Sequence, residues 1–224
     1  MGIRIDESST SIASNFMNRP QKTLELFEFE GCPFCKKVRE AVTILDLDVL
    51  FYPCPKGGPT YRTIVQQMGG KQQFPFLIDP NTKVSMYESD DIIQYLYDTY
   101  GPYGDVSTSK NFKGTSTLLS LSLSSLPRRG RGTTFAENKF KKDMKPVYFW
   151  GYEASPFCKI VRERLVELEI PHIQKTCGRG SNKRQELFEK KGRFQVPYLE
   201  DPNTGVNLFE SSDILDYINE KYSV

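Results

Sequence analysis

The sequence predicts an α/β protein made of two tandem copies of one βαβαββα domain. The first observation is an internal repeat, because residues 155–159 (SPFCK) repeat residues 32–36 (CPFCK) at an offset of 123 positions. The second is that each copy alternates short apolar-polar runs with segments of helical periodicity. The third is an Asp-Pro-Asn-Thr turn at 79–82 and again at 201–204. Together they predict a duplicated domain with a mixed sheet.

The repeat continues through each copy, with one single-residue deletion along the way. The matched positions are Cys54 with Cys177, Pro75 with Pro197, residues 88–92 (ESDDI) with 210–214 (ESSDI), and Tyr95 with Tyr217.

The elements of the first copy follow from its periodicities. Residues 24–29 alternate as a half-buried strand does, and apolar residues recur at helical spacing over 34–46. The other predicted strands are 48–53, 76–79 and 84–87, and the other helices are 58–68 and 90–100. A helix between the first two strands predicts a right-handed parallel unit, and the 79–82 turn predicts a hairpin.

The second copy repeats this order. Its predicted strands are 146–151, 171–176, 198–201 and 206–209, and its helices are 157–169, 181–191 and 212–221. The predicted organisation is therefore a flexible leader (1–20), a first domain (21–101), a linker (102–145) and a second domain (146–224).

The predicted linker opens with a helix stop at Gly101 and contains one ambiguous segment, since 115–126 fits a short helix or a strand. Its basic run at 128–131 (RRGR) would either meet an anion or stay in solvent, and short charge runs usually stay solvated.

Residues 31–36 (GCPFCK) join the first predicted strand to the first predicted helix. Cys32 is expected at the helix N-terminus, where unpaired N–H groups and the macrodipole stabilise a thiolate. Pro33 suits the first turn, because the N–H that it lacks would have no partner there. Cys35, one turn further on, can attack a mixed disulfide formed on Cys32. The pattern favours a catalytic redox pair over half of a zinc site or a buried structural pair, since the other cysteines and the single histidine form no second ligand pair.

The Cys-Pro-Phe-Cys tetrad resembles the glutaredoxin active site and also occurs in glutaredoxin-like glutathione transferase N-terminal domains. Residues 73–77 (QFPFL) resemble the cis-proline segment before the third strand of thioredoxin-like folds, and 88–92 (ESDDI) resemble the Glu-Ser motif of glutathione transferases. The resemblance implies two tandem thioredoxin-like domains, similar to plant proteins with tandem domains of this type. It also implies cis peptide bonds before Pro75 and Pro197.

The resemblance further implies a glutathione site in the first copy. Phe74 would pair its backbone with the cysteinyl part of glutathione, and Pro75 would form the bend beside it. Ser89 would hold the γ-glutamyl carboxylate at a helix start, and Glu88 or Asp91 would take the ligand amine. For Ser89 and Asp91, simple helix capping is an equal alternative.

One departure concerns Glu28 and Glu30, which stand where many glutaredoxins carry a basic residue before the first cysteine. We expect these carboxylates to repel the glycyl carboxylate of glutathione.

The second copy has Ser155 in place of Cys32, and a hydroxyl cannot form a disulfide. The resemblance to serine-type plant glutathione transferases implies that Ser155 stabilises a bound glutathione thiolate. Cys158 is then either a buried thiol or a second nucleophile, and the copy is degenerate, serving as structure or as a ligand holder. The other candidate site residues of this copy are Val196, Pro197, Glu210 and Ser211.

Two further cysteines, Cys54 and Cys177, follow the second strand of each copy. They would serve as a redox relay, as ligand thiols or as features inherited from the ancestral domain, and inheritance is the default.

The net charge, the apolar runs and the cysteine count limit the functions that the chain can have. The net charge of +2 gives no argument for nucleic acid or an anionic membrane, and no apolar run is long enough to cross a bilayer. Five cysteines without a secretory segment favour a reducing compartment. The family resemblance implies the chloroplast, with the cytosol as the alternative, although Asp6 and Glu7 argue against an intact presequence.

The sequence therefore predicts a glutathione-linked thiol–disulfide oxidoreductase that acts on protein disulfides or glutathionylated proteins. One alternative is a non-enzymatic scaffold that binds a partner or an iron–sulfur cluster through Cys32 and glutathione. Another is a transferase-like or isomerase-like activity, although no large helical domain follows the first copy to form an electrophile pocket.

Overall fold

The structure, a computed structural model, describes residues 19–101, 130–141 and 143–224. The first copy contains β1 (Leu24–Glu28), α1 (Pro33–Ile44), β2 (Val49–Pro53), α2 (Tyr61–Gly69), β3 (Phe76–Asp79), β4 (Val84–Met86) and α3 (Ser89–Tyr100). The second contains β5 (Val147–Gly151), α6 (Pro156–Glu167), β6 (His172–Thr176), α7 (Lys183–Lys191), β7 (Tyr198–Glu200), β8 (Asn207–Phe209) and α8 (Ser211–Tyr222). The predicted βαβαββα order is confirmed in both copies. The ambiguous segment 115–126 lies outside the described residues.

The largest difference from the predicted boundaries is at the start of α2, which begins at Tyr61 rather than at residue 58. Gly57 has a φ of 84°, and the Gly58 N–H donates to the Pro55 carbonyl, so a turn occupies the positions before the helix.

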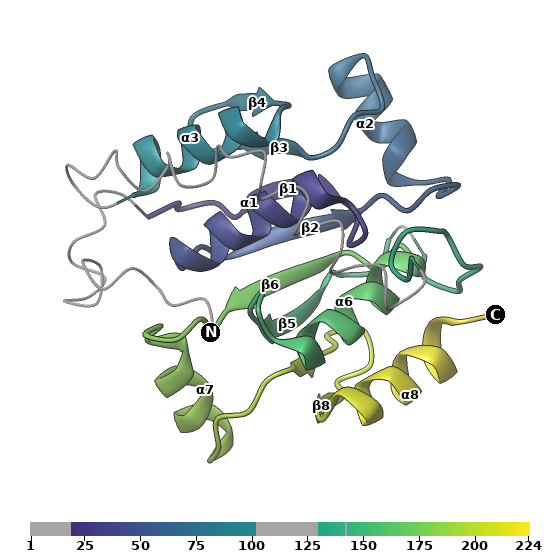
Figure 1. Cartoon of the computed structure of the whole chain (residues 1–224). Coiled ribbons are helices and arrows are strands. Elements are labelled where there is room, and N and C mark those ends of the chain that lie inside the picture. The colour runs from purple at the N-terminus through teal and green to yellow at the C-terminus, as the bar shows by residue number, and fades with distance from the viewer. Residues whose placement is uncertain (1–18, 102–129, 142) are drawn as a thin grey trace.

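The eight strands of the described residues join one sheet in the order β4-β3-β1-β2-β6-β5-β7-β8 (Figure 1). Within each copy the first two strands are parallel and the hairpin strands are antiparallel. The copies meet where β2 pairs with β6 in antiparallel register, with Phe51 opposite His172. We call this junction the seam. The sequence predicts two domains but not that their sheets are continuous.

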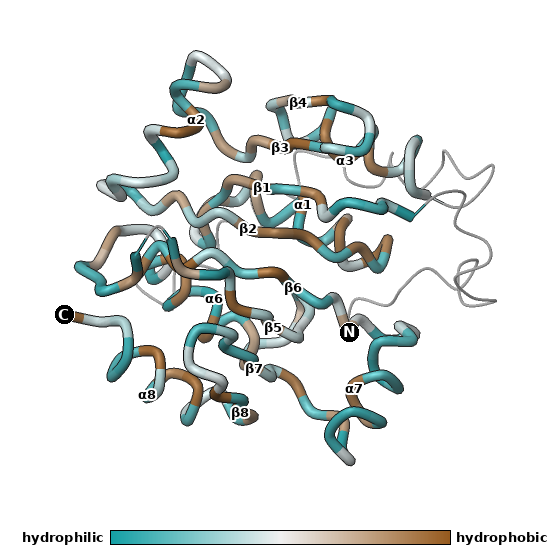
Figure 2. The backbone as a smooth tube through the Cα atoms, turned by 180° about the vertical axis from the view of Figure 1, so that it is seen from behind, coloured by the Kyte–Doolittle hydropathy of each residue, from teal (hydrophilic) through white to brown (hydrophobic). Residues whose placement is uncertain are grey.

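The helices cover the two faces of the sheet unequally. The apolar residues of β1 and β2 that pack with α1 and α3 form one core, and β5 with α6 and α8 forms the matching core of the second copy. Helices α2 and α7 cover the opposite face. Figure 2 shows apolar and polar stretches alternating along α8, as expected of a helix with one buried side. No helix among the described residues is long and apolar enough to span a membrane.

Residues 130–140, which we call the connecting segment, lie against both copies. The Gly31 N–H donates to the Gly132 carbonyl, and the Lys56 N–H donates to the Thr133 carbonyl. Further along, the Lys139 N–H donates to the Tyr222 carbonyl of α8. Gly130 and Arg131, the described part of the basic run, are exposed, whereas the backbone groups named above pair with the two copies. The rest of the run lies outside the described residues.

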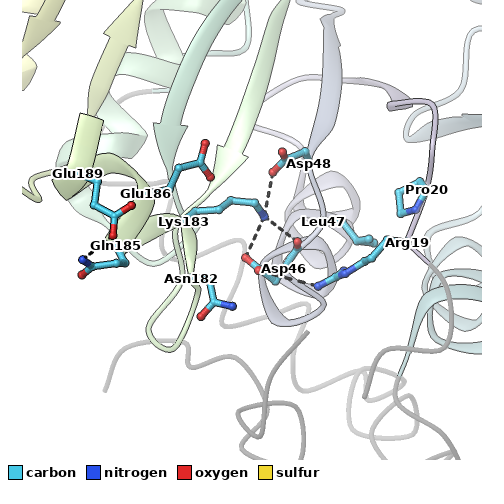
Figure 3. A pocket seen from close by; sticks show the side chains of 10 residues that line it. All are labelled: Arg19, Pro20, Asp46, Leu47, Asp48, Asn182, Lys183, Gln185, Glu186 and Glu189. Carbon is cyan, nitrogen blue, oxygen red and sulfur yellow. Dashed lines mark hydrogen bonds and ion pairs between the residues drawn. The ribbon is translucent and has the colours of Figure 1, made fainter. Parts of the chain in front are cut away.

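A cavity of about 510 Å³ lies between α7 and the α1–β2 loop, where Lys183 bridges Asp46 and Asp48 at 3.1 and 3.0 Å (Figure 3). Its lining does not include Cys32 or Ser155. These ion pairs hold the two copies together at one end of the seam.

Candidate active site

Cys32 and Ser155 are the N-cap residues of α1 and α6, and the two sites have nearly the same geometry. Cys32 Sγ accepts a hydrogen bond from the Cys35 N–H at 3.2 Å, and Ser155 Oγ accepts one from the Cys158 N–H at 3.2 Å. The backbone of both N-cap residues is extended, and a proline follows each at the first helical position. The strand–turn–helix sequence thus places one nucleophile-type side chain at each helix N-terminus.

The two thiols of the first copy differ in acidity. Hydrogen bonds from the Cys35 thiol and backbone N–H hold the pKa of Cys32 below its usual value, against the effect of burial. Burial raises the pKa of Cys35 well above its usual value, and its hydrogen bond to Cys32 raises it further. Cys32 is 5% exposed and Cys35 is fully buried. The arrangement therefore suits Cys32 as the attacking thiolate and Cys35 as a thiol held in reserve.

The segment before β3 borders this site. The Phe74–Pro75 peptide is cis, as predicted, and the Phe74 ring meets the Phe29 ring edge-on with centroids 6.2 Å apart. The Arg62 guanidinium stacks over Phe74 at 4.7 Å and over Phe29 at 5.6 Å, while Arg62 Nε donates to the carbonyls of Cys54 and Pro55. A cation is thus held beside the segment that the resemblance assigns to glutathione.

The start of α3 carries the other predicted ligand residues. Glu88 is the N-cap with a φ of 64°, and its carboxylate accepts a hydrogen bond from Gln73. Ser89 is the first helical residue and is 6% exposed, and no side chain caps α3. The capping alternative for Ser89 is therefore wrong, and its hydroxyl has no hydrogen-bond partner among the described residues. Asp91 is exposed in the first turn.

The expectation for Glu28 and Glu30 is wrong, because both carboxylates are buried in ion pairs. Arg39 contacts Glu28, Glu30 and Glu153, while Arg162 contacts Glu30 and Glu153. We call these five side chains the charge cluster. They lie inside the molecule and come from both copies, so Glu28 and Glu30 do not face a ligand as unpaired charges.

The second copy repeats most of the site without the first cysteine. Its Val196–Pro197 peptide is cis, as predicted, and Gln195 donates to Glu210 as Gln73 does to Glu88. Ser211 begins α8 as Ser89 begins α3. Arg184 stacks over Phe194 at 4.7 Å and matches Arg62 in its hydrogen bonds to the preceding loop.

The remaining cysteines are buried. Burial raises the pKa of Cys54, Cys158 and Cys177, and the thiols of Cys54 and Cys177 donate to nearby carbonyls. These environments favour unreactive thiols over a redox relay. Across the described ranges, no group of three or more His, Cys, Asp or Glu side chains is arranged to hold a metal ion.

Two side chains near the site, Arg62 and Lys37, were not predicted. Arg62 had a detectable signal, since the repeat places Arg184 at the matching position. Lys37 had none, because its ion pair with Asp90 at 2.7 Å joins α1 to the start of α3 and depends on how the helices pack.

A thioredoxin-like α/β unit with a Cys or Ser side chain at the N-cap of its first helix and a cis-proline before its third strand defines the class of each copy. Residues 26–104 and 149–224 both match the family model of the glutathione S-transferase N-terminal domain, and the chain belongs to this family.

Solved structures show weaker likenesses. A glutathione transferase of Bombyx mori is 21% identical, over 39% of this chain and 43% of that chain, with a TM-score of 0.34. A trimeric glutathione transferase of Leishmania is 13% identical, over 88% of this chain and 66% of that chain, with a TM-score of 0.30. The chain thus aligns with less than half of the Bombyx mori protein. No functionally curated protein matches it.

Proposed function

We propose that this protein is a glutathione-linked thiol–disulfide oxidoreductase in which Cys32 is the nucleophile and Cys35 the resolving thiol. The observation that carries the proposal is the difference between the two thiols. Cys32 has a lowered pKa at a helix N-cap, and Cys35 is a buried neighbour with a raised pKa.

The reaction takes place in two exchanges. The Cys32 thiolate attacks one sulfur of glutathione disulfide, which forms a Cys32–glutathione disulfide and releases one glutathione thiolate. Cys35 then loses its proton and attacks Cys32 Sγ, which forms the Cys32–Cys35 disulfide and releases the second glutathione thiolate. With a protein disulfide as the oxidant, the same two steps reduce that disulfide to two thiols.

The described side chains suit a glutathione-sized peptide beside Cys32. The γ-glutamyl carboxylate would meet the Ser89 hydroxyl and the N-terminus of α3, where unpaired N–H groups favour an anion. The glycyl carboxylate would meet Arg62, whose terminal guanidinium nitrogens make no hydrogen bond to any described residue. Arg62 takes the role that a basic residue before Cys32 would otherwise fill.

The second copy would hold reduced glutathione without reacting covalently. Ser155 Oγ lies at the same N-cap position as Cys32 Sγ, and Ser211 and Arg184 repeat Ser89 and Arg62. A serine hydroxyl can donate to a bound thiolate but cannot exchange disulfides.

The test is intact-mass and peptide mapping of the full chain after treatment with glutathione disulfide. We expect one glutathione on Cys32 in Cys35→Ser, an internal disulfide in the wild type, and neither product in Cys32→Ser. Cys158→Ser is the matched control, because Cys158 holds the place of Cys35 in the second copy, and it should react like the wild type. A stable adduct on Cys158 or Cys177 with none on Cys32 would overturn the assignment.

A further inference from the structure

The charge cluster joins the two copies directly behind the thiol pair. Arg39 Nε donates to Glu153 at 2.9 Å, and Arg162 Nη2 lies 2.8 Å from the same carboxylate oxygen. Arg162 Nε donates to Glu30 at 3.0 Å, and Arg39 also pairs with Glu28. Each copy thus contributes one arginine that pairs with a carboxylate of the other copy.

The cluster is two-fold symmetric except at one position. Arg39 matches Arg162 and Glu30 matches Glu153 at the repeat offset, but the residue that matches Glu28 is Gly151. Three carboxylates therefore face two guanidinium groups, which leaves one negative charge in excess when all are ionised. The extra carboxyl belongs to the first copy, which carries the Cys32–Cys35 pair.

Glu28 lies close to the thiols. Its charge interacts with both Cys32 and Cys35, and in the second copy a Cβ added at the matching Gly151 would stand 3.0 Å from Cys158 Sγ. Burial raises the pKa of Glu28 to about 7, although Arg39 opposes that rise. The Glu28 charge raises the pKa of Cys32 and Cys35, whereas the Arg39 charge lowers that of Cys32.

The groups around this carboxyl come from every neighbouring element. On the first copy they are Cys32, Cys35 and Arg39 of α1 and its N-cap, Glu30 in the loop between β1 and α1, and Cys54 after β2. On the second copy they are Glu153 before α6 and Arg162 on α6, and His172 of β6 interacts electrostatically with the two arginines.

We propose that the second copy tunes the chemistry of the first, with Glu153 and Arg162 as positioning residues that hold the Arg39–Glu28 pair and so set how readily Cys32 loses its proton. The proposal rests on the function proposed above and assigns the degenerate copy a role in it. Removing a carboxylate from the cluster leaves more positive charge near Cys32 and favours its thiolate. Removing a guanidinium leaves more negative charge and disfavours it.

The test measures the pH midpoint of iodoacetamide alkylation at Cys32, by peptide mass spectrometry on the full chain. We expect Glu153→Gln to lower the midpoint and Arg162→Gln to raise it, each by roughly half to one pH unit. Arg162→Lys retains the charge and should stay near the wild type. Glu25→Gln removes a carboxyl from the same strand as Glu28 but outside the cluster, and it should leave the midpoint unchanged.

Opposite shifts distinguish the proposal from a purely structural role, because general loosening of the fold would move both variants in one direction. The proposal would be overturned if both variants had the wild-type midpoint, or if both midpoints shifted in the same direction. Removing one partner of a buried ion pair leaves an uncompensated buried charge, so Arg162→Gln can fail to fold. In that case Glu153→Gln and Glu28→Gln are compared with the wild type, and both should lower the pH midpoint of alkylation. A wild-type midpoint in both variants would overturn the proposal. Alkylation needs neither glutathione nor turnover, so its outcome is independent of the glutathione disulfide experiment.

Discussion

At the scale of single residues, Arg62 shows how one cation is fixed in place. Its guanidinium stacks on two aromatic rings, and its Nε–H donates to two loop carbonyls. These contacts fix the direction of the terminal nitrogens before any ligand binds. Preorganisation of this kind lowers the entropy that binding must overcome.

We therefore expect Arg62→Met to weaken the reaction of Cys32 with glutathione disulfide. A charged hydrogen bond contributes about 1.5–3 kcal/mol, so the concentration for half-maximal rate should rise about tenfold or more. The rate of Cys32 alkylation by iodoacetamide should be unchanged, because iodoacetamide has no carboxylate that could pair with Arg62. Arg184→Met is the matched control and should leave both reactions of Cys32 at wild-type rates. Equal losses in the two variants would contradict a direct role for Arg62.

At the scale of elements, each copy stabilises the second helix of the other. Glu169, which follows α6 with a φ of 48°, accepts hydrogen bonds from the N–H groups of Thr60 and Tyr61 at the start of α2. Asp46 follows α1 with a φ of 52° and pairs with Lys183 at the start of α7. An acidic side chain at a helix N-terminus satisfies unpaired donors and complements the macrodipole.

A double-mutant cycle tests the α2 contact. Glu169→Ala should lower the free energy of unfolding by about 1–2 kcal/mol, as loss of a cap does. A Cβ at Gly58 would stand 2.4 Å from Glu169 Oε1, so Gly58→Ala should displace the carboxylate and cost a similar amount. Because both changes remove the same bonds, the second should cost little once the first is made. Additive losses in chemical denaturation would contradict this contact.

At the scale of the whole molecule, the seam makes the two copies one sheet and buries an ionisable group. The His172 ring stacks on Phe51 with centroids 5.3 Å apart, and its Nε2 has no hydrogen-bond partner among the described residues. Burial lowers the pKa of His172 to about 4. The unfolded chain therefore binds a proton that the folded one does not, and stability is lost as pH falls from about 6.5 toward 4.

We expect His172→Phe to remove this acid sensitivity. The difference in unfolding free energy between wild type and variant should change by roughly 2 kcal/mol between pH 6.5 and 4.5, in favour of the variant at low pH. Glu28, with its raised pKa, has the opposite sign, since its stabilising effect is present at low pH and is lost as pH rises toward 7. Its effect is common to both proteins and cancels in the comparison. Urea unfolding of both proteins at three pH values gives these free energies. Plots of unfolding free energy against pH that run parallel for wild type and His172→Phe would contradict the prediction.

The element order and the position of Cys32 at a helix start could be predicted from the sequence because both depend on short-range rules. Apolar periodicity assigns strands and helices within a few residues, and the proline after Cys32 favours a helix start at that point. The internal repeat then transfers each assignment to the other copy. The start of α2 was predicted three residues early, because the turn before it depends on the Gly58 backbone contact rather than on periodicity.

The sequence by itself determined that the chain holds two related domains and that only the first has two cysteines at the helix start, while the family resemblance implied which prolines form cis bonds. Only the tertiary structure decided that the domains share one sheet and that Glu28 and Glu30 point into a buried cluster. The physical reason is distance along the chain. Arg39 and Glu153 are far apart in sequence, and no local pattern states whether a charged side chain will meet water or a partner of opposite charge.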